Sequence, residues 1–69
     1  MMKLSARNQI TGTVVSITTG AVNGTIKVDI GGGNVVTASI TEEAIAELAL
    51  ATGDAVTVVV KASDVMIGK

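Results

Sequence analysis

The sequence contains no cysteine, no histidine and no aromatic residue, and each absence excludes a class of protein. Without cysteine, neither a disulfide nor a thiolate metal centre can stabilise the fold. Without histidine as well, a zinc site of the usual kind is excluded. Without aromatic side chains, the core loses its largest contributors, and a nucleic-acid-binding module loses the surfaces on which bases stack.

The small size of the chain makes these absences important. Its 69 residues predict a single domain, residues 1–69, near the lower size limit for a self-sufficient core. Small folds are usually supported by disulfides, by structural metals or by association with other chains, and here association is the support that is left. Since 48% of the residues are apolar, we expect an obligate oligomer that buries apolar surface between its subunits.

Charge and hydropathy argue against two kinds of partner. The formal net charge is −1, which does not favour attraction to nucleic acid or anionic lipid. No apolar run approaches the ~18 residues of a transmembrane helix, and residues 1–7 are too short and polar for a signal peptide. We therefore expect a cytoplasmic protein with neither nucleic acid nor a membrane as its partner.

Periodic hydropathy predicts strands over most of the chain. Asn23-Gly24 is the strongest hairpin signal, and the glycine run at residues 31–33 permits positive φ in a second turn. The stretch 55–60 is apolar on both faces, which indicates a surface covered by a partner. The predicted strands are residues 9–17, 25–30, 34–40, 55–60 and 65–67.

Residues 41–50 change to the helical period. Ile45, Leu48 and Ala49 recur at helical spacing, and Thr41 suits the N-cap. The order strand-strand-strand-helix-strand-strand predicts an all-β fold with one short helix, specifically an OB-like Greek-key barrel.

The sequence offers few of the residue types that carry out catalysis. There is no histidine, cysteine or tyrosine, and no base stands ready to activate a hydroxyl group. Lys61 would act as a base only if burial lowered its pKa, and Glu43 and Glu47 are interpreted as a solvated helix face. The glycine run 31–33 lacks the lysine of a phosphate-binding loop and precedes a strand. We therefore expect no enzyme and no metal site.

Basic and hydroxyl residues instead cluster in two segments. Ser5 and Arg7 stand just before the first predicted strand, and Lys61 and Ser63 stand where the strand 55–60 ends. The predicted helix start at Thr41 adds free N–H groups, which favour anions. If neighbouring chains bring these pieces together, they surround a tetrahedral dianion with donors. Taken alone, each segment is better explained as solvated surface charge.

The residues of these segments resemble a known family. Residues 5–9, Ser-Ala-Arg-Asn-Gln, followed by a strand with Gly12, resemble the opening of the molbindins, also called Mop domains. The similarity continues through the glycine turn 31–34, the helix entry 39–41 and the ending 60–67, so it covers essentially the whole chain. The opening and the Lys-x-Ser/Thr-Asp-Val-Met-Ile ending are specific, whereas the glycine turn alone would be weak.

The resemblance implies a fold, an assembly and a ligand. Molbindins are OB-like barrels with strand exchange between subunits, and they assemble as homo-hexamers, trimers of dimers. They bind molybdate or tungstate at subunit interfaces, without an organic cofactor, for intracellular storage or homeostasis of molybdenum. We expect the stand-alone form of the family, in which no further domain is attached.

The resemblance also implies which residues bind the oxyanion. One further family contact, often serine, falls near Ala44, where only the backbone N–H is available. A second class of site near the threefold axis has the turn 20–23 as a candidate. The residues that match the family's ligand positions are Ser5, Arg7, Thr41, Lys61, Ala62 and Ser63.

Two other functions fit the same expected fold. One is an OB-type nucleic-acid-binding module, which the missing aromatic residues and the slight negative charge disfavour. The other is a structural oligomerisation domain without a physiological ligand, in which the polar clusters only line an interface.

Overall fold

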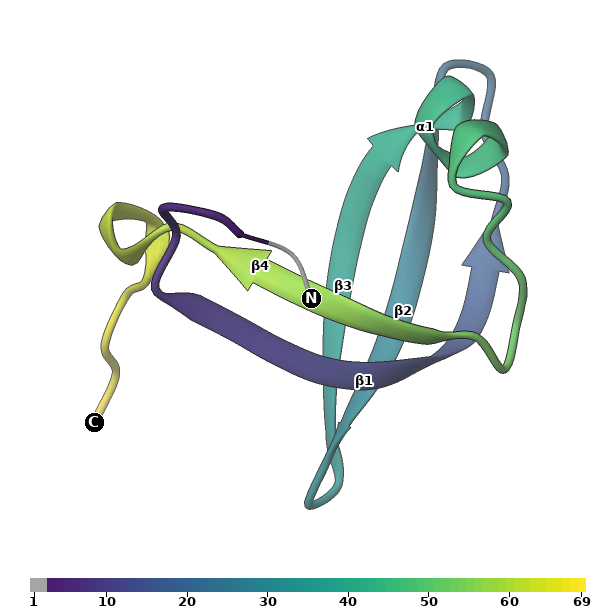
Figure 1. The fold of residues 1–69 in the computed structure, drawn as a ribbon. Helices are drawn as coiled ribbons and strands as arrows, with labels where there is room; N and C mark the ends of the chain where they lie inside the picture. The colour runs from purple at the N-terminus through teal and green to yellow at the C-terminus, as the bar shows by residue number, and fades with distance from the viewer. Residues whose placement is uncertain (1–2) are drawn as a thin grey trace.

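The computed structural model describes residues 3–69 as one curled antiparallel sheet with a short helix at one end (Figure 1). Met1 and Met2 lie outside the described residues, so the expectation about a signal peptide at residues 1–7 falls partly outside them. None of the helical segments within residues 3–69 has the length and hydropathy of a bilayer-spanning helix. The elements are β1 (Asn8–Thr18), β2 (Asn23–Gly31), β3 (Asn34–Thr41), α1 (Glu42–Glu47), β4 (Ala55–Val60) and a 3-10 turn (Ala62–Asp64).

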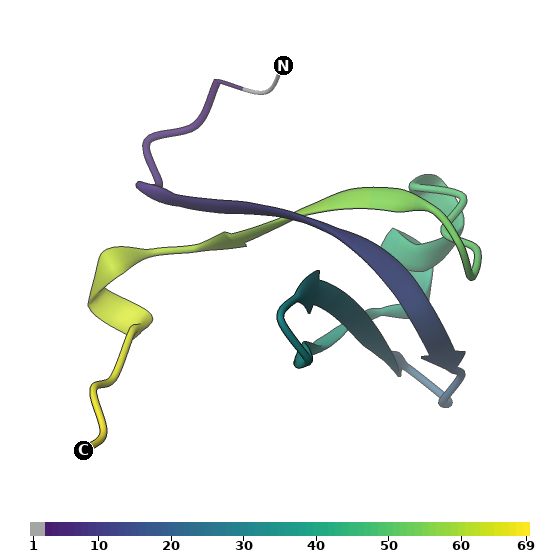
Figure 2. The same cartoon turned by 90° about the horizontal axis from the view of Figure 1, so that it is seen from below.

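Strand β1 belongs to both halves of the sheet, whose order is β3-β2-β1-β4. Its first part pairs with β4, from Asn8↔Val60 to Thr13↔Ala55, and its second part pairs with β2. Figure 2 shows β1 running beside β4 and then bending toward β2. At Gly12 a Cβ would lie 2.6 Å from Val28 Cγ1, so only glycine lets the two strands cross this closely. The predicted all-β, OB-like class with one short helix is confirmed.

The interior of the curl is apolar and open. Val14, Ile26 and Val28 are the buried hydrophobic residues of the described chain. Beside them lies a groove of ≈ 260 Å³, lined by apolar side chains from all four strands and by Leu48 and Leu50. Strands β3 and β4 form the two edges of the sheet. Within residues 3–69 the barrel is therefore curled but not closed, and strand exchange stays a prediction.

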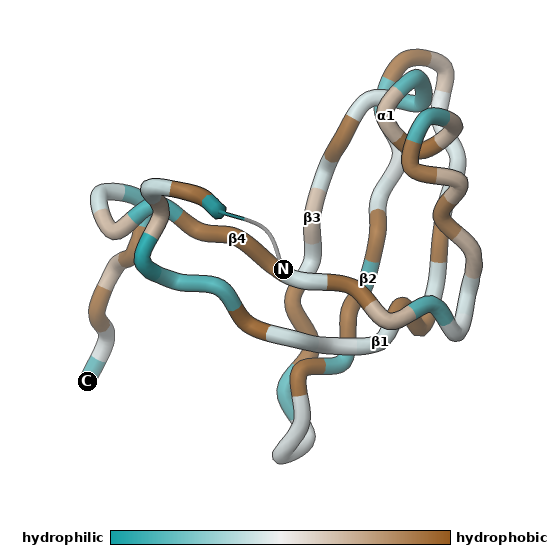
Figure 3. Tube along the Cα trace, in the orientation of Figure 1, coloured by the Kyte–Doolittle hydropathy of each residue, from teal (hydrophilic) through white to brown (hydrophobic). Residues whose placement is uncertain are grey.

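Apolar side chains also lie on the outside. Met66 and Ile67 are 91% and 90% exposed, and Val22 and Leu48 are 70% and 66% exposed. Figure 3 shows the apolar residues along β4 and in the C-terminal segment. On the surface of a monomeric protein, large apolar side chains are usually exposed one at a time and not in groups.

The glycine turn and the helix start are as predicted, but the helix is shorter than predicted. Gly31, Gly32 and Gly33 have φ of 97°, 63° and 80°, as predicted. Thr41 is the N-cap of α1, and its Oγ1 accepts a hydrogen bond from Ala44 N at 3.0 Å, also as predicted. The helix is shorter than the predicted 41–50 and ends at Glu47.

The predicted hairpin between the first two strands forms, but its turn does not lie at Asn23-Gly24. Strand β2 begins at Asn23, and the connection from β1 lies at residues 19–22. Gly24 has no positive φ; instead, a Cβ there would lie 2.5 Å from Ile45 Cδ1. The absence of a side chain at this position lets the helix pack closely on β2, a tertiary contact that has the same local sequence signal as a turn.

The last predicted strand is also wrong for the single chain. Residues 65–67 follow the 3-10 turn as extended chain without strand pairing. A strand needs a ladder partner, and in the chain as described these residues reach neither edge of the sheet. On β4, Ala55 and Val59 are exposed in the single chain, so the covering of this strand by a partner stays a prediction. Both predictions came from apolar composition, which does not say where the covering surface comes from.

The end of α1 contains a strained residue. Ala49 has φ 50°, in the left-handed region, directly after the C-cap Leu48. This is the position at which helices usually place glycine. An L-residue in this conformation costs about 1–2 kcal/mol, part of which glycine offsets by its larger loss of backbone entropy.

We expect Ala49→Gly to stabilise the fold by about 0.5–1 kcal/mol, because the left-handed cost exceeds the added entropy cost. Thermal unfolding of the ligand-free protein measures this as a higher Tm. Ala46→Gly is the matched control: Ala46 is exposed inside α1, and its replacement should destabilise by about 1 kcal/mol. Equal losses of Tm in the two variants would contradict the argument.

Candidate functional site

The two polar segments meet at one end of the β1–β4 ladder. The last pair of this ladder is Asn8↔Val60, so Arg7 directly precedes the paired part of β1 and Lys61 directly follows that of β4. Residues paired across antiparallel strands have their Cα atoms about 4.5–5.5 Å apart. Figure 1 shows the N-terminal segment beside the 3-10 turn, away from α1. The segments, expected to come together from neighbouring chains, already lie side by side in one chain.

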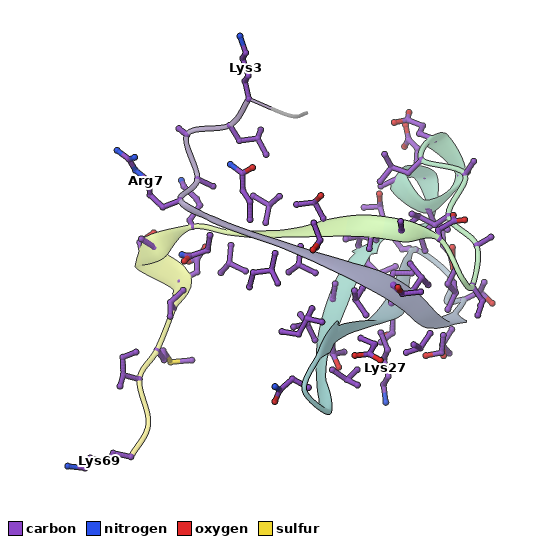
Figure 4. The ribbon with its side chains drawn as sticks, turned by 60° about the horizontal axis from the view of Figure 1, so that its bottom comes forward. Lys3, Arg7, Lys27 and Lys69 are labelled. Atoms are coloured by element: carbon purple, nitrogen blue, oxygen red, sulfur yellow. The ribbon has the colours of Figure 1, made fainter. Side chains whose placement is uncertain are left out.

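The side chains of this cluster are open to solvent. Ser5, Arg7, Lys61, Ala62 and Ser63 are all exposed. Figure 4 shows Arg7 at the start of β1, close to the 3-10 turn, with its side chain pointing away from the sheet. A guanidinium, an ammonium and hydroxyl groups are thus free to bind a ligand from outside.

The 3-10 turn fixes the backbone after β4. Asp64 N donates to Lys61 O at 2.9 Å, and Val65 N donates to Ala62 O at 3.3 Å. These bonds occupy two carbonyl oxygens that would otherwise repel an anion. The first N–H groups of a helical turn have no partner inside it, so those of Ala62 and Ser63 are left as donors.

Thr41 lies elsewhere in the chain. It pairs with Asn23 at the end of β3, beyond the β1–β2 pair Thr18↔Thr25, whereas Arg7 precedes the opposite end of β1. Its hydroxyl oxygen accepts from Ala44 N. The N–H of Ala44, the one donor available for the additional family contact, is therefore already used. The structure brings five of the six predicted residues together and leaves Thr41 apart.

The turn considered for a second site is tied to the helix. Gly20 N donates to Glu42 Oε1 at 2.8 Å, and Glu42 N donates to Val22 O at 2.7 Å. A carboxylate thus already occupies one of the N–H groups of the turn. The role of residues 20–23 in anion binding stays a prediction.

Two amide side chains at the start of β1, those of Asn8 and Gln9, bind backbone carbonyl oxygens of the cluster segments. Asn8 Nδ2 donates to Val60 O at 3.1 Å, and Gln9 Nε2 donates to Ala6 O at 2.9 Å. Each therefore binds the backbone next to a basic residue. The signal for them was their place in the opening motif, but spacing alone does not say which carbonyl an amide binds.

The charges of the cluster suit an anion. Lys3 and Arg7 lie on the same N-terminal segment (Figure 4), and Lys61 follows β4, so three of the five basic residues gather at this end. Asp64 is the acidic residue of the 3-10 turn. Within residues 3–69 there is no group of three or more acidic residues placed to hold a metal ion. The arrangement offers donors for an oxyanion rather than ligands for a cation.

Comparison with known proteins gives consistent relatives. A TOBE domain matches residues 4–67. A probable molybdenum-pterin-binding protein of Haemophilus influenzae is 48% identical over 67 residues, which cover 97% of each chain. The structure of a molybdate-binding protein from Sporomusa ovata superposes with a TM-score of 0.92 at 40% identity, covering 99% of this chain and 100% of that one.

A third relative was solved with its ligand. The cytoplasmic molybdate-binding protein ModG, with molybdate bound, superposes with a TM-score of 0.89 at 48% identity. The match covers 94% of this chain and 46% of ModG. Together with the match over residues 4–67, these similarities show that the chain belongs to the TOBE domain family, as a member of its molbindin (Mop) type.

Proposed function

We propose that this chain binds molybdate or tungstate reversibly and without catalysis, for the storage or homeostasis of molybdenum in the cytoplasm. The observation that carries the proposal is the register Asn8↔Val60, which sets the Arg7 and Lys61 segments side by side. Relatives named for molybdate binding, with 40% and 48% identity, support the choice of ligand. No organic cofactor is needed for this role.

The donors determine what the site can distinguish. Arg7 and Lys61 supply charge-assisted hydrogen bonds, the strongest class that an oxyanion accepts. Ser5, Ser63 and the N–H groups of the 3-10 turn add neutral donors that respond to the size of the anion. A smaller sulfate reaches fewer of them at once, so the site should favour molybdate and tungstate.

The proposed assembly is a homo-hexamer, a trimer of dimers with strand exchange. It is supported by the open groove beside Val14 and by the exposed Met66 and Ile67, which a single chain leaves uncovered. A neighbouring chain could also bring Thr41 to the cluster at the Arg7 end. Binding at such an interface stabilises the assembly by mass action.

The two alternative functions are less well supported. A nucleic-acid-binding module would need stacking aromatic residues, and the chain has none. A purely structural domain would have no reason to gather three basic residues at one end of a chain with net charge −1. The relatives compared above are named for molybdate or molybdenum, not for assembly.

We expect Arg7→Ala and Lys61→Ala each to weaken molybdate binding about ten- to a hundred-fold, since each removes a charge-assisted hydrogen bond of about 1.5–3 kcal/mol. Titration calorimetry with molybdate, tungstate, sulfate and phosphate measures this. Lys27→Ala is the control, because Lys27 is exposed on β2, apart from the cluster (Figure 4). Equal losses in all three variants would indicate general charge attraction instead of a site.

We expect molybdate affinity to stay nearly constant between about pH 5 and 8, since the chain has no histidine to titrate in that range. Calorimetric dissociation constants at several pH values and constant ionic strength test this. A sharp loss between about pH 7 and 8 would count against a site built from Arg7 and Lys61.

We expect the purified chain to be oligomeric at micromolar concentration and its Tm to rise by several degrees with molybdate. Both follow from a ligand that binds between subunits. Sedimentation velocity and thermal melts, each with and without molybdate, measure the two effects. A stable folded monomer would contradict the assembly, and an unchanged Tm at millimolar molybdate would contradict binding.

A further inference from the structure

We propose that Asn8 and Gln9 are positioning residues of the oxyanion site, which act by binding the carbonyl oxygens next to its cationic residues. The inference rests on the proposed function, because it assigns a role relative to the bound anion. It concerns residues that do not themselves reach the ligand. Their amide groups keep acceptor oxygens away from the anion and hold the donor segments in place.

The Gln9 amide acts on the N-terminal segment. Its Nε2 donates to Ala6 O at 2.9 Å, and Ala6 stands between Ser5 and Arg7. A carbonyl oxygen carries partial negative charge, so a free one beside these donors would repel a dianion. The bond to Gln9 engages this oxygen and fixes the peptide plane between Ala6 and Arg7, which also orients the Arg7 N–H.

The Asn8 amide acts on the other segment. Its Nδ2 donates to Val60 O at 3.1 Å, across 52 residues of sequence. Val60 directly precedes Lys61, so this bond fixes the point at which the chain leaves β4. It also occupies the carbonyl oxygen of the residue before Lys61. The Asn8 side chain that makes this bond is itself half-buried.

The pair works because the two residues are adjacent on one strand. Successive side chains of a strand point to opposite faces, so neighbouring amides can reach two different segments. Asn8 reaches across to β4, and Gln9 reaches back to the chain before β1. One strand end thereby sets the relative positions of both donor segments.

The Gln9 bond contributes little to the fold itself. Gln9 is exposed, and its bond spans three residues. Bonds of this kind exchange readily with water, so their net effect on stability is small. The turn between β2 and β3 contains a matched bond away from the site: Asn34 Nδ2 donates to Gly31 O at 3.2 Å, also exposed and three residues apart.

The test compares Gln9→Met with Asn34→Leu, since each replaces an amide by an apolar side chain of similar shape. We expect Gln9→Met to weaken molybdate binding about ten-fold, the effect of one hydrogen bond of ordinary strength, with ligand-free Tm and oligomeric state unchanged. Asn34→Leu should leave the dissociation constant unchanged. Asn8→Ser should weaken binding as well, and its Tm reports any added structural loss.

A carbonyl ¹³C spectrum of the ligand-free protein gives an independent readout. The Ala6 carbonyl resonance should shift in Gln9→Met and stay in place in Asn34→Leu. If Gln9→Met binds molybdate as tightly as wild type, or the Ala6 resonance does not move, the positioning role is overturned. If wild type itself does not bind molybdate, the proposed function fails first, which separates the two failures.

Discussion

The antiparallel register between β1 and β4 is the constraint on which the proposed site depends. It pairs Asn8 with Val60, so the chain enters and leaves the sheet at the same point. A slip of one residue would turn every side chain of β4 to the other face. Val56 and Val58 pack against the core, and the slip would expose them. Apolar burial in the core thereby holds the polar segments in register.

β1 carries this constraint through the molecule because it pairs on both sides. Its close approach to β2 at Gly12 lets one strand serve two halves of the sheet, with Val14 buried between them. A larger residue at Gly12 would push β1 away from Val28 and change the direction in which its first residues run. The site at the far end of the strand therefore depends on packing in the middle.

The local sequence pattern was sufficient to predict an element wherever contacts nearby in the same chain determine that element. Alternation located the strands at 25–30 and 34–40, apolar and β-branched composition located those at 9–17 and 55–60, the glycine run located the turn with positive φ, and Thr41 located the helix start. The errors fall where the determining partner is distant: Gly24 lies against Ile45 of the helix instead of in the turn, and residues 65–67 have no partner strand in the chain as described. The adjacency of Arg7 and Lys61 follows from β1–β4 pairing, which spacing alone could not supply because the two residues are far apart in sequence.

The cluster lies where few contacts within the chain hold the backbone in place. The described part of the N-terminal segment and all of residues 61–69 are exposed except for the half-buried Ala6, and the bonds given for their side chains and turns are local or come from Asn8 and Gln9. Ordering such segments costs conformational entropy. In the proposed assembly, neighbouring chains and a bound dianion supply the compensating contacts. If that assembly forms, the small core and the open site have one cause: a chain without aromatic residues or disulfides depends on its partners for further apolar burial.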